Sequence, residues 1–404
     1  MGRFVVVVLD SFGVGAMDDV PEVRPRDIGA NTCRHIIEAK PDLELPTLEK
    51  LGLINALGKE IGKFKFSETA VYGISDLMHE GGDTFLGHQE IMGTIPKRPL
   101  IQPFNDVIDE VYAALVEKGY DVQFIGNNAK LLLVNDCVTV GDNLETDPGR
   151  VYNVTGCLDL IDFNSIKAIG RVVRSVVKIS RVIAFGGEDV TKEDLIAAIR
   201  ENEGKYIGVD APKSGVYKKG YQVIHLGYGI DPQVQVPTIL GKMGIPVALI
   251  GKVADIVEND YGTSIAGVES AWLFEQTIEQ IQKMENGYVC LNIQETDLAG
   301  HAEDVERYAD RLKVSDAYLA KLIEKLSEED ILVIMADHGN DPTIGHSNHT
   351  RERVPLLIYK KGESTKYIGH RKTMSDVGAT AVDYFAAPKT ENGSSFLQLL
   401  NLEK

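Results

Sequence analysis

Hydrophobic residues along this chain gather in short runs that are apolar at nearly every position. The longest reads FVVVVL and spans residues 4–9, and similar runs follow at residues 247–250, 288–293, 331–336 and 355–359. A strand that is apolar on both faces is covered on both faces, as in a parallel sheet between two layers of helices. We therefore expect these runs to be buried strands of one such sheet.

Helical patterns occupy much of the chain between the apolar runs. Residues 304–326 place apolar side chains mostly three or four positions apart, and residues 271–284 show a similar spacing. Strands that alternate with helices along a chain are typical of an α/β fold.

The middle of the chain carries a second set of strand and helix patterns. Apolar runs such as RVIAF at 181–185 alternate there with helical stretches, and the region lies between a proline-rich segment and the glycine- and lysine-rich SGVYKKGYQ. A chain of 404 residues also exceeds what a single core usually holds. We expect residues 97–220 to form a smaller α/β domain, inserted into a core made of residues 1–96 and 221–404.

The net charge and the cysteine content of the chain argue against several classes of function. The formal net charge is -18, with 60 acidic against 42 basic residues, which argues against binding to nucleic acid or to anionic membranes. A phosphorylated small molecule would need local cations, from metal ions or a few lysines and arginines. The four cysteines form no C-x-x-C pair, and the first apolar run is too short for a signal sequence or a membrane span. We expect a cytoplasmic protein with reduced thiols, and we leave its oligomeric state open.

Residues of the metal-ligand type follow three of the apolar runs. In an open parallel sheet ligands bind beyond the carboxyl ends of the strands, so such residues can converge on one site. Carboxylates and imidazoles together suit manganese or magnesium. Any one of these aspartates or histidines alone is better explained as a helix N-cap or as a surface or core residue, but their coincidence favours a metal site. The candidates are Asp10, Asp297, His301, Asp337, His338 and, in the loop after the last of these, His349.

A candidate nucleophile lies in the segment HEGGDTFLGHQEIMGT. Glycines on both sides of Thr84 let the backbone approach a ligand closely. A threonine hydroxyl is a poor nucleophile at neutral pH, and metal coordination is one of the few ways to activate it. Alone, this segment would be interpreted as a glycine-rich turn with a local Asp83–Thr84 hydrogen bond. Together with a metal site, it indicates a nucleophile.

Four segments resemble the phosphopentomutases of the alkaline phosphatase superfamily. They read VVLDSFGVGAM, GGDTFLGHQEIMG, IGKVADI and ADHGNDP followed by HTRERVPLL. Further matches extend to GSSFL near the C-terminus, so the resemblance covers the core over most of its length. It implies an alkaline-phosphatase-like α/β/α sandwich with an inserted α/β cap domain.

The resemblance also implies a mechanism. It assigns Asp10, Asp337 and His338 to one manganese ion and a second set of three ligands to the other. Thr84 would bridge both ions and carry the phosphoryl group, passing it between two positions of a sugar such as ribose 1-phosphate and ribose 5-phosphate. The second set of ligands would be Asp297, His301 and His349.

The substrate side departs from the family pattern. Phe185 stands where the family has an arginine after the RVIA run, and the acidic residue expected near a YNVTG turn at 152–156 is missing. A basic stretch is represented only by APKSGVYKK, in which Lys213 is a candidate phosphate ligand, and Lys252 in IGKVADI matches a family lysine near the site. Phosphoryl transfer is expected, whereas ribose phosphate as the substrate is in doubt.

Three other functions remain as alternatives. A mutase for another phosphorylated metabolite or a metal-dependent phosphohydrolase would use the same centre. A dinucleotide-binding oxidoreductase is disfavoured, because Gly13 and Gly15 lack the third glycine of the fingerprint and Asp10 would face the pyrophosphate. A catalytically silent binding protein is disfavoured because the metal positions and Thr84 are all present.

Overall fold

The structure is a computed structural model that describes residues 2–145, 148–362 and 365–400. Its contacts divide the chain into two units, Met1–Pro96 with Asp231–Lys404, and Lys97–Ile230. The second boundary therefore lies ten residues beyond the expected position at 220. The reason is that strand β10 (Gln222–Gly227) pairs with strand β7 (Arg181–Gly187) inside the second unit.

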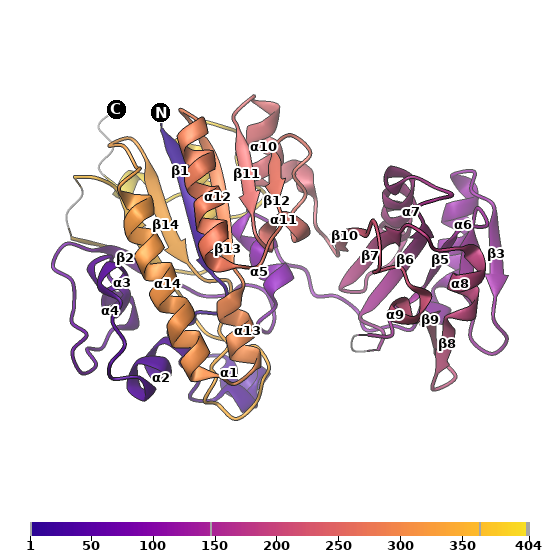
Figure 1. Ribbon diagram of the computed structural model, residues 1–404, viewed down its shortest axis with the longest axis horizontal. Coiled ribbons are helices and arrows are strands. Elements are labelled where there is room, and N and C mark those ends of the chain that lie inside the picture. The colour runs from indigo at the N-terminus through magenta and orange to yellow at the C-terminus, as the bar shows by residue number, and fades with distance from the viewer. Residues whose placement is uncertain (1, 146–147, 363–364, 401–404) are drawn as a thin grey trace. The chain divides into compact units, whose positions relative to one another are not determined.

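The first unit is built on a mixed sheet with the order β12-β11-β13-β1-β14-β15-β2-β16 (Figure 1). Each predicted apolar run lies in one of its strands. The strand that contains the last predicted run, β15, is antiparallel to both of its neighbours, so the expectation of a parallel strand there was wrong. The strands are β1 (Arg3–Leu9), β2 (Val71–Ser75), β11 (Val247–Ile250), β12 (Thr263–Ile265), β13 (Gly287–Ile293), β14 (Ile331–Met335), β15 (Val354–Tyr359) and β16 (Lys366–Arg371).

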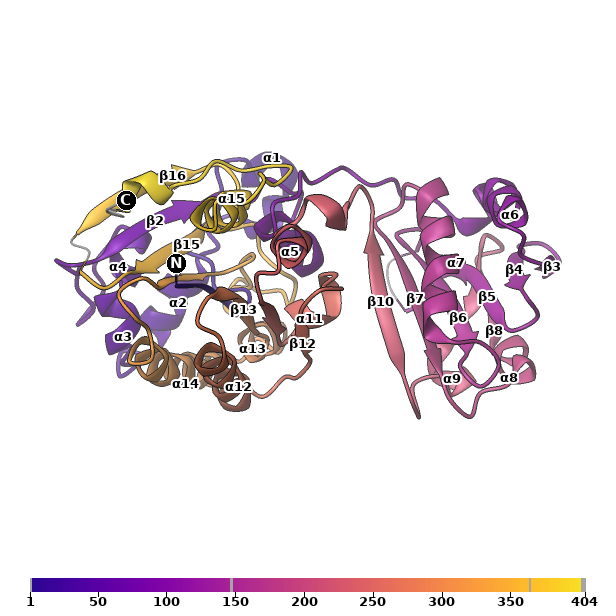
Figure 2. The same ribbon diagram turned by 90° about the horizontal axis from the view of Figure 1, so that it is seen from above.

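Helices cover both faces of this sheet, which gives the α/β/α sandwich (Figure 2). The apolar runs are buried on both faces for this reason. One layer contains α2 (Thr32–Ala39), α3 (Pro46–Lys50), α12 (Ser270–Lys283) and α14 (Val305–Ile323); the other contains α5 (Thr84–Ile91), α10 (Val236–Lys242) and α15 (Ser375–Tyr384). Shorter helices are α1 (Val20–Val23), α4 (Leu53–Leu57), α11 (Val253–Ile256) and α13 (Glu295–His301).

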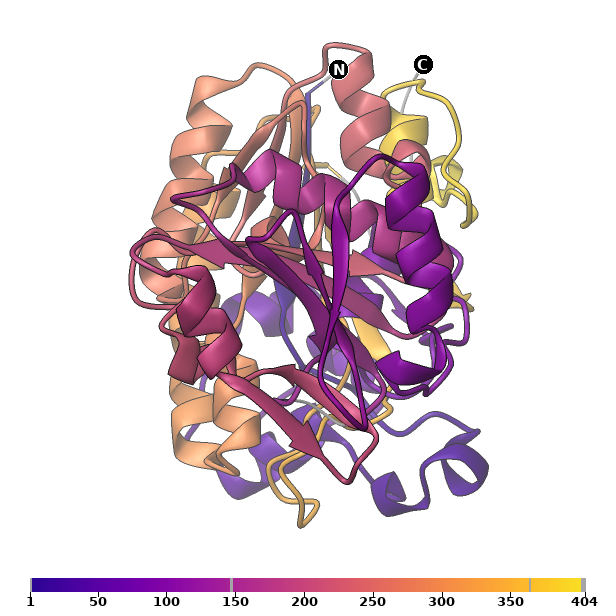
Figure 3. The same ribbon diagram turned by 90° about the vertical axis from the view of Figure 1, so that its right-hand side faces the viewer.

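The second unit has its own sheet, in the order β10-β7-β6-β5-β4-β3 (Figure 3). Helices α6 (Ile108–Glu117) and α7 (Phe163–Val176) cover one face, and α8 (Lys192–Ala197), α9 (Ala211–Ser214) and the hairpin β8–β9 (Ile199–Asn202, Tyr206–Val209) pack on the other. The segment YNVTG, expected as a turn, is part of β6, because both neighbours pair with it along its length. The remaining strands are β3 (Val122–Ile125), β4 (Leu131–Val134), β5 (Val138–Asp142) and β6 (Val151–Cys157).

Two sequence expectations can be compared with the described residues. All four cysteines are buried and free. Among the helices of the described ranges, none combines the length and the apolar character that crossing a membrane requires.

Candidate metal centre and nucleophile

Strand order brings the candidate ligands together. Strand β1 lies between β13 and β14, with Leu9 opposite Ile293 and Val8 opposite Met335. Asp10 therefore lies at the carboxyl ends of the strands, beside the segments that follow β13 and β14. Those two segments carry Asp297 and Asp337.

Asp297 and His301 lie on helix α13, which directly follows strand β13. Four residues apart, they share one face of the helix, and His301 Nε2 is 3.5 Å from Asp297 Oδ2. A single helical turn in ETDLAGH therefore places both side chains at the same site.

The first ligand group consists of Asp10, Asp337 and His338, whose candidate ligand atoms all lie within 4.8 Å of one another. His338 Nε2 is 3.6 Å from Asp10 Oδ1 and 3.3 Å from Asp337 Oδ2. All three side chains are fully buried. The next residue after Asp10, Ser11, has a left-handed φ of 68° and donates its backbone N–H to Asp337 Oδ1 at 3.0 Å. This strained turn holds Asp337 beside Asp10.

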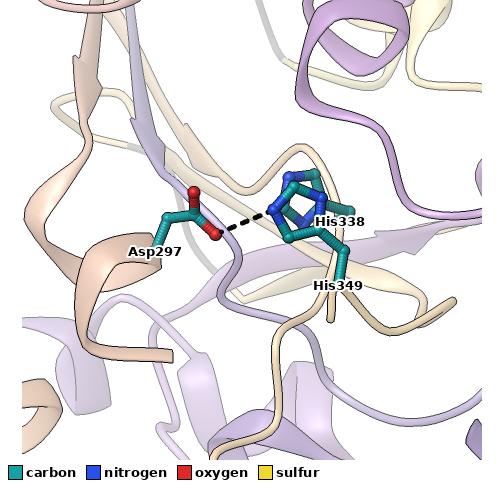
Figure 4. Close-up of side chains that lie close together, drawn as sticks. All are labelled: Asp297, His338 and His349. Carbon is teal, nitrogen blue, oxygen red and sulfur yellow. Dashed lines mark ion pairs between the residues drawn. The ribbon is translucent and has the colours of Figure 1, made fainter. Parts of the chain in front are cut away.

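The second ligand group consists of Asp297, His338 and His349. His349 Nε2 is 3.2 Å from Asp297 Oδ1, and the His338 and His349 rings stack with centroids 3.9 Å apart. Figure 4 marks the ion pair with a dashed line. His301, which the sequence analysis placed in this set, lies at its exposed side with Nε2 2.9 Å from His349 Nε2. His338 thus belongs to both ligand groups.

Hydrogen bonding prepares the three histidines as metal ligands. Each turns Nδ1 toward a backbone carbonyl: His338 toward Gly339 at 3.0 Å, His349 toward Gly82 at 2.8 Å and His301 toward Ser347 at 2.7 Å. Donation from Nδ1 leaves the lone pair on Nε2, which faces the carboxylates. His338 Nε2 is buried without a hydrogen-bond partner. This donor set fits hard divalent cations.

Thr84 lies at the edge of the first ligand group. It is the first residue of helix α5, where the segment taken alone suggested a glycine-rich turn, and Asp83 caps the helix by accepting the Leu86 N–H at 2.8 Å. Thr84 Oγ1 donates toward Asp10 Oδ1 at 3.2 Å and contacts Asp337 Oδ2. A helix N-terminus favours negative charge, so this position suits a phosphorylated hydroxyl.

Burial and neighbouring charges shift the pKa values of the buried aspartates and of His338. Burial, and then the neighbouring Asp337, raise the pKa of Asp10. Burial acts in the same direction on Asp297, but hydrogen bonds from His301 and His349 outweigh it and hold the pKa of Asp297 well below its usual range. Burial, and then His349, lower the pKa of His338 to about 3, which keeps its imidazole neutral.

Lys252 is the cation of this centre. Its Nζ lies 3.1 Å from Asp10 Oδ2 and 3.4 Å from Asp297 Oδ2. Burial would lower the pKa of Lys252, but Asp10 and Asp297 raise it above its usual value. Lys213, the other candidate lysine, belongs to the second unit and pairs with Asp210 at 2.6 Å.

Three polar residues that support the ligands were missed by the sequence analysis. Asn292 donates to Asp10 Oδ2 at 3.1 Å, and its amide lies 3.1 Å from His88 Nε2. His88 Nδ1 in turn bonds the Thr84 carbonyl at 2.8 Å, and Asn340 donates to Asp297 Oδ1 at 3.2 Å. The polar Asn292 inside an otherwise apolar run was the one signal that could have revealed this set.

An α/β/α sandwich with carboxylates and imidazoles at the carboxyl ends of its central strands defines a metal-dependent enzyme of the α/β class. The pattern of the metalloenzyme superfamily matches residues 2–389. The chain belongs to this superfamily, and within it to the relatives of the phosphopentomutases.

Two curated relatives support this assignment. The phosphopentomutase of Aeromonas salmonicida is 31% identical, over 98% of this chain and 100% of its own length. The phosphopentomutase of Desulfitobacterium hafniense is also 31% identical, over 98% of this chain and 99% of its own. Among solved structures, Leishmania mexicana phosphoglycerate mutase aligns with a TM-score of 0.49 and 12% identity, over 98% and 97% of the two chains. The protein is an enzyme of the phosphomutase type, with an alkaline-phosphatase-like fold and a divalent metal site.

Proposed function

We propose that this phosphomutase moves a phosphoryl group between two positions of a phosphorylated sugar, with phosphorylated Thr84 as the intermediate. The position of Thr84 carries the proposal, because its hydroxyl contacts Asp10 and Asp337 at the N-terminus of α5. The ribose 1-phosphate and ribose 5-phosphate pair is the first substrate to test, since the curated relatives are named phosphopentomutases.

Two manganese ions, or magnesium in their place, are the proposed cofactors. Asp10, Asp337 and His338 would hold one ion, and Asp297, His301 and His349 the other, with Thr84 between them. Divalent cations bound there would lower the pKa of the Thr84 hydroxyl and neutralise charge on the phosphoryl oxygens.

Groups of the protein itself favour the negative charge of the phosphoryl group during transfer. In the forward step the bond between phosphorus and Thr84 Oγ1 breaks and a bond from phosphorus to a sugar hydroxyl oxygen forms, while the sugar hydroxyl gives up its proton and Thr84 Oγ1 takes one up, so that the threonine hydroxyl is restored. The Lys252 ammonium and the α5 N-terminus favour the negative phosphoryl group. The reverse step from the other position of the sugar restores phosphorylated Thr84.

The test is intact-protein mass spectrometry with peptide mapping, on manganese-loaded enzyme incubated with sugar phosphates and their bisphosphates. We expect one added phosphate on Thr84, which a substrate sugar phosphate then removes. Thr84→Ala should lose transfer by at least about 1,000-fold, because nucleophilic catalysis is removed, while Thr84→Ser should retain part of it. Full turnover by Thr84→Ala would contradict the mechanism.

The same experiment separates the proposal from its alternatives. Release of inorganic phosphate without isomerised sugar would indicate a phosphohydrolase, in which water accepts the phosphoryl group from Thr84. Isomerisation of another phosphorylated metabolite, with none of ribose phosphate, would retain the mechanism and change the substrate. The proposed setting is the cytoplasm, with a small phosphorylated metabolite as the partner.

A further inference from the structure

A buried histidine and a buried glutamate meet beside the helix that carries Thr84. His79 lies in the loop before α5, and Glu90 lies in the last turn of α5. Both side chains are fully buried, and His79 Nδ1 is 2.8 Å from Glu90 Oε2. Neither residue belongs to the two ligand groups of the metal centre, so metal binding does not explain this pair.

Hydrogen bonds on both sides of the ring define the tautomer of His79. Burial alone would raise the pKa of Glu90, but the hydrogen bond from His79 and those from other donors outweigh it and hold that pKa below its usual value. The ionised carboxylate can only accept, so His79 Nδ1 carries the proton. On the other side, the Asp83 N–H donates to His79 Nε2 at 3.3 Å. His79 is therefore neutral, with its lone pair on Nε2.

The carboxylate of Glu90 has enough donors without the imidazole. It accepts the N–H groups of Met78 at 3.0 Å and Met374 at 2.9 Å, and the hydroxyl of Thr373 at 2.7 Å. These bonds connect α5 to the loop before it and to the turn before α15. Because they already compensate the buried charge, the specific contribution of the imidazole is its bond to the Asp83 N–H.

Asp83 connects His79 to the nucleophile. Its side chain accepts the Leu86 N–H at 2.8 Å, and its carbonyl accepts the Gly87 N–H at 2.7 Å. These two bonds fix Asp83 to the first turn of α5, and the bond to His79 fixes its N–H from the other side. Thr84 follows directly in the chain, so the orientation of Asp83 determines where the Thr84 hydroxyl lies.

The segment between His79 and Asp83 has little stiffness of its own. Two of its three residues are glycines, and Gly81 has a left-handed φ of 77°. Glycine has more backbone freedom than any other residue, so these positions do little to restrict where Asp83 lies. A hydrogen bond from the ring at one end of the segment to the N–H at its other end removes much of this freedom.

We propose that His79 is a positioning residue for the nucleophile. Its imidazole, oriented by Glu90, holds the Asp83 N–H. This bond keeps Thr84 Oγ1 against the carboxylates of the first ligand group, where the phosphoryl group is transferred. The inference rests on the proposed function, in which Thr84 is the nucleophile, and His79 acts through Asp83 rather than on the phosphoryl group itself.

Two substitutions separate the two bonds of the imidazole. Along the side chain, the amide of asparagine lies at the position of Nδ1 and the amide of glutamine at the position of Nε2. His79→Asn therefore keeps the bond to Glu90 and loses the bond to Asp83, whereas His79→Gln keeps an acceptor for Asp83. A residue that only supported Glu90 would tolerate asparagine better. A positioning residue tolerates glutamine better.

Hydrogen–deuterium exchange at the Asp83 amide tests the bond without turnover. The measurement uses the metal-loaded full chain and mass spectrometry with electron-transfer fragmentation. Exchange at Asp83 should be about tenfold faster in His79→Asn than in the wild type, and within about threefold of the wild type in His79→Gln. The Thr84→Ala background should give the same pattern, because the bond does not involve phosphate. Equal exchange in the wild type and His79→Asn would overturn the proposal.

The tautomer can be tested on the unsubstituted chain, which matters if His79→Asn does not fold by circular dichroism. Nitrogen-15 NMR of the magnesium-loaded protein distinguishes protonated from unprotonated ring nitrogens, and His79→Gln assigns the signals of His79. We expect a proton on Nδ1 and none on Nε2. A proton on Nε2 would overturn the proposal, because that nitrogen could not then accept the Asp83 N–H.

Kinetics give a further readout. His79→Asn should lower kcat about 10- to 100-fold with little change in KM, because a displaced nucleophile slows transfer, whereas a residue that is 1% exposed does not contact the substrate. His79→Gln should retain kcat within about threefold. Metal content by elemental analysis should match the wild type in both. Higher activity of His79→Asn than of His79→Gln, or a rise in KM at constant kcat, would overturn the proposal.

His370 provides the matched control. It forms a similar histidine–carboxylate pair, with Nε2 2.6 Å from Asp76, but it lies on the edge strand β16. His370→Asn and His370→Gln should both keep kcat and the exchange at Asp83 within about twofold of the wild type. If exchange at Asp83 depends on His79 as expected but Thr84 never gains phosphate, the bond is retained and the proposed function is refuted instead.

Discussion

Lys252 is a partly exposed residue whose charge offsets that of the carboxylates beside it. Its ammonium lies between Asp10 and Asp297, and their carboxylates keep the lysine charged. Near the same carboxylates, His338 stays neutral because burial opposes its charged form. The same burial therefore acts differently on two neighbouring bases, according to the partners that each one has.

The Lys252 ammonium can be removed without removing its length. Lys252→Met should lower kcat/KM for phosphoryl transfer by about 100-fold, since a preorganised charge near developing negative charge typically contributes that much. Steady-state kinetics at saturating manganese would measure it. Lys213→Met is the control in the second unit, where the lysine is exposed and paired with Asp210, and a change below about threefold is expected there. An equal effect of both substitutions would argue against a specific role for Lys252.

Asp142 in β5 should make the stability of the protein depend on pH. Burial raises the pKa of Asp142 to about 6, although the N–H groups of Ile207 and Phe104 bond its carboxylate. The folded state then holds a proton that the unfolded state releases between about pH 4 and pH 6. The free energy of unfolding should fall as pH rises through this window, by up to about 3 kcal/mol.

Urea unfolding at pH 4, 5, 6 and 7 would measure this contribution. Asp142→Asn should be less stable than the wild type at pH 4, because it loses one acceptor, and its stability should change less between pH 4 and 6. Asp136→Asn, at an exposed site paired with Lys192, is the control that should follow the wild type. Parallel pH profiles for the wild type and Asp142→Asn would refute the assignment.

At the scale of elements, the loop before α5 determines where Thr84 lies. The Arg351 guanidinium donates to the carbonyls of His79 at 2.6 Å, Gly81 at 3.1 Å and Leu77 at 3.2 Å. Gly82 in the same loop is packed so tightly that an added Cβ would lie 2.9 Å from the Thr350 carbonyl. The loop is thus held by residues that follow His349 in the sequence, through the Arg351 side chain and the Thr350 backbone.

Arg351→Lys should loosen this loop, because one ammonium cannot reach three carbonyls at once. We expect kcat to fall 10- to 100-fold, since small displacements of a nucleophile are costly, and amide exchange at residues 77–83 to accelerate. Hydrogen–deuterium exchange and kinetics would measure the two effects. Arg353→Lys is the matched control, because Arg353 pairs with Asp18 and Asp76 and should leave the loop protected. Faster exchange at residues 77–83 in both variants would contradict the specific role.

At the scale of the whole molecule, the centre joins parts of the chain that are far apart in sequence. Asp10, Asp297 and Asp337 bring three carboxylates together in a protein whose net charge is already -18. The chain itself provides Lys252 as the cation in contact with two of them. Bound divalent cations would relieve the remaining repulsion only in the folded state.

Metal should therefore stabilise the fold. Manganese at about 1,000 times its dissociation constant should add about 4 kcal/mol to the free energy of unfolding, or about 5–10 °C in Tm, and EDTA should reverse the change. Differential scanning calorimetry would measure the shift. Asp337→Asn should show a smaller shift and a lower metal content, whereas Asp383→Asn, at a residue of α15 outside both ligand groups, should match the wild type. Equal shifts in Asp337→Asn and the wild type would refute its role as a ligand.

Much of the fold could be predicted because buried strands require apolar residues, and runs of apolar residues can be recognised in the sequence. The runs at β1, β13 and β14 are apolar on both faces since helices cover both sides of the sheet. The direction of a strand does not change its pattern of apolar residues, which is why β15 was expected to be parallel. Strand β6 contains Asn153 and Thr155 at buried positions, so its sequence resembled a turn rather than a core strand.

The sequence by itself determined the strand-forming runs, the ligand-type residues that follow three of them, and the resemblance that joins these to Thr84. It did so because these features are local and depend on residue type and spacing. Only the tertiary structure decided that β1 lies between β13 and β14, that His338 borders both ligand groups, and that Asn292 and His88 support them. Those relations depend on strand order and side-chain direction, which residues distant in sequence acquire only when the chain folds.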